Sequence, residues 1–89
     1  GTSLIGASIE DETDQVMKNI KSILAEANLD FNDVIKISIF MKDLSLFSRV
    51  NETYGSYFKS DTAPARETVE VNKLPKNANI EMSIIAGIA

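Results

Sequence analysis

The sequence predicts an α+β fold in which one sheet carries two helices on a single face. Three patterns indicate this fold. Apolar residues recur at helical spacing over 9–27 and again over 47–58. Residues 34–42 alternate between apolar and polar side chains, as a strand with one buried face does. Two further strand-like segments, 64–71 and 79–88, follow, so the expected order is helix, strand, helix, strand, strand.

The first helix is expected to begin after Ser8, whose hydroxyl can cap it together with Asp11 three residues on. The acidic residues 10–12 suit the positive end of the helix dipole. Asn28 is expected to cap the other end. The predicted buried stripe of this helix consists of Ile9, Thr13, Val16, Met17, Ile20, Ile23, Leu24 and Ala27.

The strand at 34–42 is expected to turn alternate side chains toward the helices, namely Ile35, Ile37, Ile39 and Met41. Asp43 or Ser45 can cap the second helix. The apolar stripe of that helix is predicted to comprise Phe47, Val50, Tyr54, Tyr57 and Phe58. Asn51 is expected to lie off this stripe.

Pro64 is expected at the start of the first of the last two strands, because proline cannot donate a ladder hydrogen bond. Pro75 is expected in the connection between these strands, where it fixes φ. If these strands pair as a hairpin, Arg66 and Glu81 lie on neighbouring strands. The second face of the sheet is expected to carry Lys36, Ser38, Phe40, Arg66, Thr68, Glu81, Ser83 and Ile85. This half-apolar face has no further element to cover it, which indicates an oligomer surface.

Length and composition narrow the class of protein. We expect a single domain over 1–89. The net charge of −4 and pI near 4.6 argue against non-specific nucleic-acid or acidic-membrane binding. The chain has neither cysteine nor histidine, which excludes thiol chemistry and argues against zinc, so no metal or cofactor is expected. Lack of cysteine suits a reducing compartment, cytoplasmic or mitochondrial.

Four polar residues are candidates for a site. The planar guanidinium of Arg66 matches a carboxylate, although an ordinary strand-edge arginine is the common case. Glu81 can orient or activate water, or be a solvated carboxylate. Asn51 and Thr68 can hydrogen-bond a ligand, or be a surface helix residue and a β-branched strand residue. The residues alone leave a surface ion pair and an anion clamp beside a general base both open.

The order of these residues resembles a known family. Pro64-Ala65-Arg66-x-x-Val69-Glu70-Val71-x-x-Leu74-Pro75-Lys76, followed by Ile80-Glu81, is similar to the signature of the RidA family, the reactive intermediate deaminases, also called the YjgF or endoribonuclease L-PSP family. Upstream, Lys42-Asp43-Leu44, Phe47 and Val50-Asn51-x-x-Tyr54 resemble its second-helix pattern. The resemblance covers essentially all 89 residues.

The resemblance implies a chorismate-mutase-like fold and a homotrimer with sites between subunits. It implies cofactor-free hydrolysis of enamine and imine intermediates, such as 2-iminobutanoate and 2-iminopropanoate, to 2-oxo acids and ammonia. Arg66 would bind the substrate carboxylate, Glu81 would orient the attacking water, and Asn51 and Thr68 would lie in the site. Two departures bear on activity: the family's N-terminal strands, which help to line the pocket, have no counterpart here, and Thr68 stands where many members have cysteine.

Two other functions remain to be weighed. Some members of the family are described as endoribonucleases or translation inhibitors, but the acidic balance and the lack of histidine argue against a nuclease of the acid-base type. A non-catalytic protein that binds small carboxylates would use the same arginine. The expected partners are therefore a small imino or 2-oxo acid and further copies of the chain, with no nucleic acid and no membrane.

Overall fold

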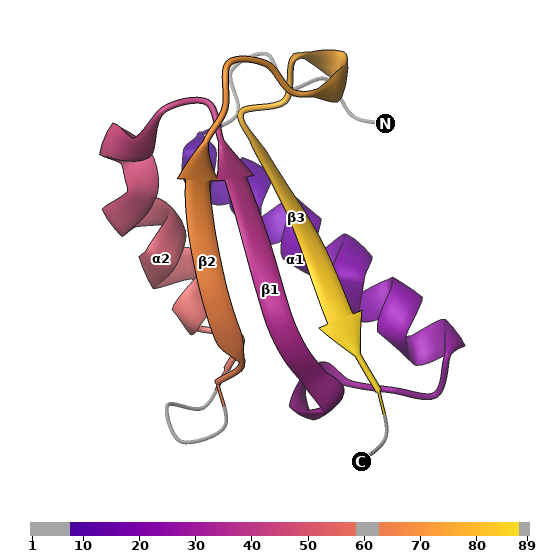
Figure 1. The fold of residues 1–89 in the computed structure, drawn as a ribbon. Helices are drawn as coiled ribbons and strands as arrows, with labels where there is room; N and C mark the ends of the chain where they lie inside the picture. The colour runs from indigo at the N-terminus through magenta and orange to yellow at the C-terminus, as the bar shows by residue number, and fades with distance from the viewer. Residues whose placement is uncertain (1–7, 59–62, 88–89) are drawn as a thin grey trace.

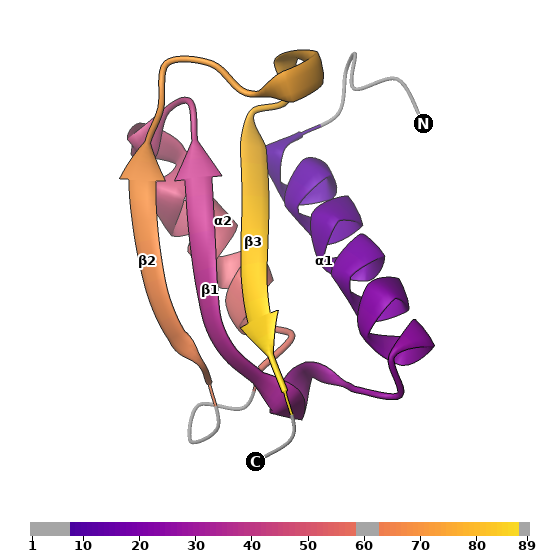
Figure 2. The same ribbon diagram turned by 45° about the vertical axis from the view of Figure 1, so that its right-hand side comes forward.

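A computed structural model describes residues 8–58 and 63–87. Figures 1 and 2 show two helices, α1 (Ile9–Glu26) and α2 (Phe47–Gly55), on one face of a sheet. The strands are β1 (Val34–Met41), β2 (Ala65–Glu70) and β3 (Ile80–Ala86), and the short 3₁₀ turns are η1 (Phe31–Asp33), η2 (Leu44–Leu46) and η3 (Pro75–Asn77). The predicted α+β class and element order are confirmed. No described helix has the length and apolar character needed to cross a membrane.

The three strands are ordered β2-β1-β3. β2 runs parallel to β1, to which α2 connects it, and β3 runs antiparallel to β1 on its other side. The hairpin considered for the last two strands is therefore wrong, because β1 separates them. The central place suits β1, since its Ile37, Ile39 and Met41 are completely buried beneath the helices.

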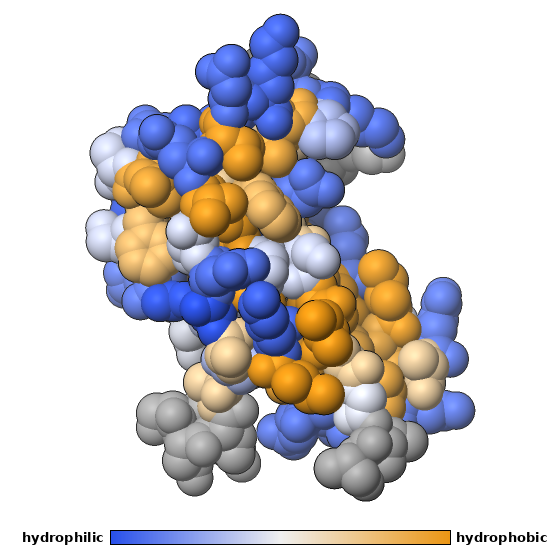
Figure 3. Space-filling view, in the orientation of Figure 1, coloured by the Kyte–Doolittle hydropathy of each residue, from blue (hydrophilic) through white to orange (hydrophobic). Residues whose placement is uncertain are grey.

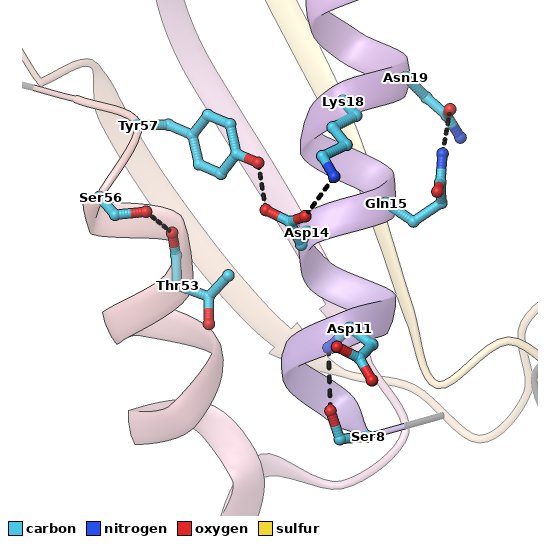
Figure 4. Close-up of polar contacts among 9 residues, drawn as sticks. All are labelled: Ser8, Asp11, Asp14, Gln15, Lys18, Asn19, Thr53, Ser56 and Tyr57. Carbon is cyan, nitrogen blue, oxygen red and sulfur yellow. Dashed lines mark hydrogen bonds and ion pairs between the residues drawn. The ribbon is translucent and has the colours of Figure 1, made fainter. Parts of the chain in front are cut away.

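Local signals at both ends of α1 are confirmed. The Ser8 hydroxyl accepts a hydrogen bond of 3.0 Å from the amide of Asp11 (Figure 4). Asn28 adopts a left-handed backbone with φ of 61°, and the amide of Leu29 donates to the carbonyl of Leu24 at 2.8 Å. This second contact is the bond that closes a Schellman C-cap.

Polar contacts join the two helices. The guanidinium of Arg49 forms a two-pronged pair with Glu10, at 2.5 and 2.6 Å, and this hydrogen bonding lowers the pKa of Glu10 to about 2. Tyr57 follows α2 and donates its hydroxyl to Asp14, which also pairs with Lys18 at 2.9 Å (Figure 4). The bond to Asp14 raises the pKa of Tyr57 to about 12. These contacts, one at Glu10 and one at Asp14 of α1, therefore join the two helical segments at two points.

A buried carboxylate anchors the start of β3. Glu12 is only 5% exposed, and its carboxylate accepts from the backbone amide of Asn79 at 2.7 Å and from its side-chain amide at 3.0 Å. The carbonyl of Asn79 accepts from the amide of Lys42, just after β1. Glu12, which the sequence suggested only as a charge near the helix dipole, therefore ties α1 to the junction of β1 and β3.

One inward residue of β1 was predicted wrongly. Ile35 is 60% exposed, whereas Val34 is buried at 5% exposure. The pairing of β1 with β3 shifts register between Val34 and Lys36, as at a β-bulge. A bulge adds one residue to one strand, so the alternation of side chains is reversed on its far side.

The face of the sheet away from the helices, here called the open face, is partly apolar. Directly paired residues lie on the same face of a sheet. Val69 and Glu81 both pair with Phe40, so all three lie on the open face. Val69 and Ile85 are 41% and 58% exposed, and Figure 3 shows hydrophobic residues among polar ones on this side. No described element covers this face.

The prediction that Arg66 and Thr68 lie on the open face is wrong. They pair with Ile37 and Ile39, which face the helices. Glu67 lies on the open face instead, where it accepts from the Ser38 hydroxyl at 2.9 Å.

Candidate functional site

Arg66 lies where β2 faces α2. Its Nη1 donates to Oδ1 of Asn51, and its guanidinium carbon lies 5.0 Å from the ring centre of Phe47 and 5.4 Å from that of Tyr54. Positions 47, 51 and 54 follow i, i+4, i+7 spacing, so they share one face of α2. Asn51, predicted to lie off the apolar stripe, therefore lies among its aromatic residues and contacts Arg66.

These contacts fix the guanidinium without covering it. Cation–π contacts at exposed sites contribute about 0.5–1 kcal/mol each. Arg66 is an exposed residue, and in residues 8–58 and 63–87 no carboxylate forms an ion pair with it. Burial raises the pKa of Tyr54, opposed by the charge of Arg66, so its phenol stays neutral. The arrangement presents a positioned cation at a sheet edge, which suits a carboxylate.

A cavity of about 330 Å³ lies beside this arginine, lined by Leu44, Phe47 and Thr68. The Thr68 hydroxyl oxygen is buried and has no hydrogen-bond partner among the described residues. Glu70, two residues farther along the same face of β2, accepts from the backbone amide of Leu44 at 2.9 Å. Sequence reasoning selected Thr68 but missed Leu44, Phe47 and Glu70 as site residues. The alternation of Arg66, Thr68 and Glu70 along one strand face was the available signal for Glu70.

Glu81 lies far from this group within one chain. It pairs with Phe40 on the open face, while Arg66 pairs with Ile37 on the helix face. The Cα atoms of Arg66 and Glu81 are separated by two inter-strand spacings across the sheet and by three residues along the strands. These separations correspond to a distance of about 14 Å. One copy of the chain therefore does not bring Arg66 and Glu81 to the same small molecule.

Metal ligation finds no support in the part of the chain that the structure describes, where no group of three or more acidic residues is placed to hold an ion. The available chemistry is anion recognition by Arg66, hydrogen bonding by Asn51 and Thr68, and a separate carboxylate, Glu81, on the open face.

The fold and this exposed arginine define a small α+β protein with a positioned cation at one edge of its sheet. Residues 1–88 match the family described as endoribonuclease L-PSP. A RutC family protein of Pyrococcus abyssi is 45% identical over 83 residues, covering 93% of this chain and 65% of its own. Reactive Intermediate Deaminase A, chloroplastic, of Arabidopsis thaliana is 44% identical over 82 residues, 92% of this chain and 43% of its own. The chain belongs to the RidA/YjgF family and spans less than two thirds of these two relatives.

Solved structures agree with this assignment. The YjgF gene product of E. coli is 40% identical, with a TM-score of 0.83, over 90% of this chain and 65% of its own. E. coli TdcF with bound serine is 34% identical, with a TM-score of 0.86, over 93% of this chain and 67% of its own. The two helices on a mixed sheet are therefore the fold of the RidA-like proteins.

Proposed function

We propose that this protein hydrolyses reactive 2-imino acids and their enamine tautomers, such as 2-iminobutanoate and 2-iminopropanoate, to 2-oxo acids and ammonia. The observation that carries the proposal is the guanidinium of Arg66, fixed by Asn51 and two aromatic rings at an exposed edge beside a cavity. Two relatives support it. One is named a reactive intermediate deaminase, and another holds serine, a small amino acid with a carboxylate.

Each residue has a distinct role in the proposed reaction. Arg66 binds the substrate carboxylate through paired hydrogen bonds, and Asn51 orients the guanidinium. Glu81 orients a water and accepts its proton as the oxygen attacks the imine carbon. The imine nitrogen takes that proton from Glu81, which gives the carbinolamine. Glu81 then accepts the hydroxyl proton and passes it to the nitrogen as the carbon–nitrogen bond breaks and the carbonyl forms. One imine and one water thus give one 2-oxo acid and one ammonia.

The proposed site is shared between copies of the chain. Because Arg66 and Glu81 lie on opposite faces of the sheet, the water-orienting carboxylate has to come from a second copy. The partly apolar open face, with Val69 and Ile85 exposed, gives that copy a surface to pack on. We propose a homotrimer, in which a closed ring gives every copy one complete site.

Hydrolysis of freshly generated 2-iminobutanoate tests this proposal. A threonine dehydratase supplies the imine, and formation of 2-oxobutanoate is compared with its uncatalysed rate. We expect Arg66→Ala to lower kcat/KM on the order of 100-fold, because charge-assisted hydrogen bonds to the carboxylate are lost. Arg66→Lys should recover part of the activity, since it keeps the charge without the planar fork.

Arg49→Ala is the matched control, because it removes the chain's other arginine, which pairs with Glu10 across the helices. It should keep full turnover in conditions where the variant is folded. Equal activity of wild type and Arg66→Ala would contradict the proposal. Arginine-dependent binding of 2-oxobutanoate without turnover would indicate a non-catalytic carboxylate-binding protein instead.

A further inference from the structure

Glu12 is a buried carboxylate that the proposed reaction does not use. Only 5% of the residue is exposed, and no cation in residues 8–58 and 63–87 forms an ion pair with it. A buried charge destabilises a protein unless hydrogen bonds compensate its lost hydration. Asn79 supplies two such bonds, because its backbone and side-chain amides donate to the two carboxylate oxygens at 2.7 and 3.0 Å. Glu12 and Asn79 therefore hold each other in place.

Asn79 connects this contact to Glu81. It directly precedes β3, two residues before Glu81, and Figure 2 shows the start of β3 beside the first turn of α1. The carbonyl of Asn79 accepts from the amide of Lys42 at 3.2 Å, so α1 and the end of β1 both hold this residue. Two residues of a strand span about 7 Å, so Glu81 lies within that distance of an anchored position.

The chain that enters β3 requires an anchor of this kind. Lys76 and Asn77, in the turn before it, both have left-handed backbones, with φ of 58° and 56°. Residues other than glycine adopt this conformation at an energetic cost, so the turn persists only where neighbouring contacts hold it. Among the described strands, β3 has a partner on one side only. The contact between Glu12 and Asn79 therefore limits the movement of the first residues of β3.

We propose that Glu12 is a positioning residue for Glu81. The inference rests on the proposed function, in which Glu81 orients the attacking water. By holding Asn79, Glu12 fixes the backbone from which the Glu81 side chain reaches that water. A misplacement of about 1 Å can lower a rate on the order of 100-fold. Glu12 acts on the attack and not on binding of the substrate carboxylate, because Arg66 lies on β2 at the opposite edge of the described sheet.

The turnover of each competent site tests the inference. Calorimetric titration with 2-oxobutanoate gives its affinity and the number of competent sites, and kcat for 2-iminobutanoate is expressed per competent site. We expect Glu12→Ala to lower this kcat on the order of tenfold, because Glu81 is held less well, and to leave the affinity unchanged. A variant that is only less stable loses competent sites, while each remaining site keeps the wild-type kcat.

Thr13→Val is the matched control. Thr13 follows Glu12 in α1, is completely buried, and donates its hydroxyl to the carbonyl of Ile9 at 2.7 Å. The variant loses a buried hydrogen bond within α1 and keeps the contact between Glu12 and Asn79. It should lower the free energy of unfolding and leave kcat per competent site unchanged. A kcat per competent site that is the same in Glu12→Ala as in Thr13→Val overturns the inference.

An exchange of donor and acceptor tests the contact itself and keeps a side chain at both positions. Asn79→Asp places a second carboxylate against Glu12, and the repulsion should lower kcat per competent site as Glu12→Ala does. Adding Glu12→Gln should restore kcat to within about twofold of the wild type, because the new amide donates to the new carboxylate. If Glu12→Ala does not fold, these variants decide the inference, and a double variant no faster than Asn79→Asp overturns it.

Backbone dynamics separate this inference from the proposed function. Relaxation of ¹⁵N measures the order parameter of the Glu81 amide without any turnover. If the wild type hydrolyses no imine, the proposed function fails, and the order parameter decides whether Glu12 positions Glu81. It should then be lower in Glu12→Ala than in the wild type and in Thr13→Val. Equal order parameters in these three proteins would overturn the positioning role as well.

Discussion

At the scale of single residues, Tyr54 combines two roles. It is 5% exposed and belongs to the core, yet its ring also packs against the guanidinium of Arg66. Its hydroxyl oxygen is buried and has no hydrogen-bond partner among the described residues. An unpaired buried hydroxyl costs about 1–3 kcal/mol relative to a paired one, so this position is not optimised for stability.

Tyr54→Phe should therefore leave the free energy of unfolding unchanged or raise it by up to about 1 kcal/mol, because it removes only the unpaired hydroxyl. Urea unfolding at neutral pH measures this change. Tyr57→Phe is the matched comparison and should lower stability, since the Tyr57 hydroxyl donates to Asp14. A loss in Tyr54→Phe as large as in Tyr57→Phe would show that the Tyr54 hydroxyl is paired.

At the scale of helices and strands, the sequence predicted local structure better than it predicted which strands pair. The helix itself, its Ser8 cap and its Asn28 terminus depend on neighbouring residues, and all three are confirmed. The predicted buried stripe of α1 was wrong at Ile23 and Ala27, which are exposed. The order of the strands depends on contacts far apart in the chain, and alternation alone does not specify it. The hairpin prediction, which ignored that β1 could separate the last two strands, was wrong for this reason.

The positions of the site residues were hard to predict for the same reason, because they too depend on contacts between distant parts of the chain. Arg66 was selected from its chemistry, but its face followed from pairing with Ile37, a register that no local pattern reveals. Asn51 was expected to lie off the apolar stripe because that stripe was drawn through Val50, whereas β2 meets the adjacent stripe of Phe47, Asn51 and Tyr54. Leu44 and Glu70 joined the site only through a tertiary hydrogen bond.

The contact between α1 and α2 gives a pH dependence. Hydrogen bonding to Arg49 lowers the pKa of Glu10 from 4.5 to about 2. The folded protein thus binds this proton less readily than the unfolded chain, so the stabilisation is complete above about pH 4.5 and is lost as the pH falls toward 2. The free energy of unfolding of the wild type should therefore fall more steeply over this range than that of Glu10→Gln.

Urea titrations at a series of pH values between 2 and 5 measure this difference. Glu26→Gln serves as the control, because it removes a carboxylate from the last residue of α1, far along the helix from the pair with Arg49. Its slope should match that of the wild type. Parallel slopes for Glu10→Gln and wild type would show that the pair with Arg49 does not persist in solution.

At the scale of the whole molecule, the two faces of the sheet have different tasks. The helix face buries the core and holds Arg66 at the β2 edge. The open face carries Glu81 with exposed Val69 and Ile85, and no described element covers it. Among the described strands β2 lies at the edge of the sheet, and five of its six residues are exposed. In the proposed assembly this edge and the open face are the surfaces that a second copy would use.

Mixing two inactive variants tests whether the site is shared. Arg66→Ala lacks the proposed anion-binding group and Glu81→Gln lacks the proposed water-orienting carboxylate, so under the proposed function each alone should be inactive. In a hybrid of the proposed trimer, an interface that takes Glu81 from the Arg66→Ala chain and Arg66 from the Glu81→Gln chain is intact. Random assembly from equal amounts gives an intact pair at about a quarter of the interfaces, so co-refolded material should recover about a quarter of the wild-type turnover.

The control is Arg66→Ala co-refolded with the double variant Arg66→Ala/Glu81→Gln, in which no interface regains the arginine and turnover should stay absent. Differently tagged chains, purified through both tags, establish that hybrids have formed. Hybrids as inactive as either parent would contradict a site shared between copies. Recovered turnover would mean that assembly completes the site, because the distance between Arg66 and Glu81 within one chain leaves a second copy as the source of the missing group.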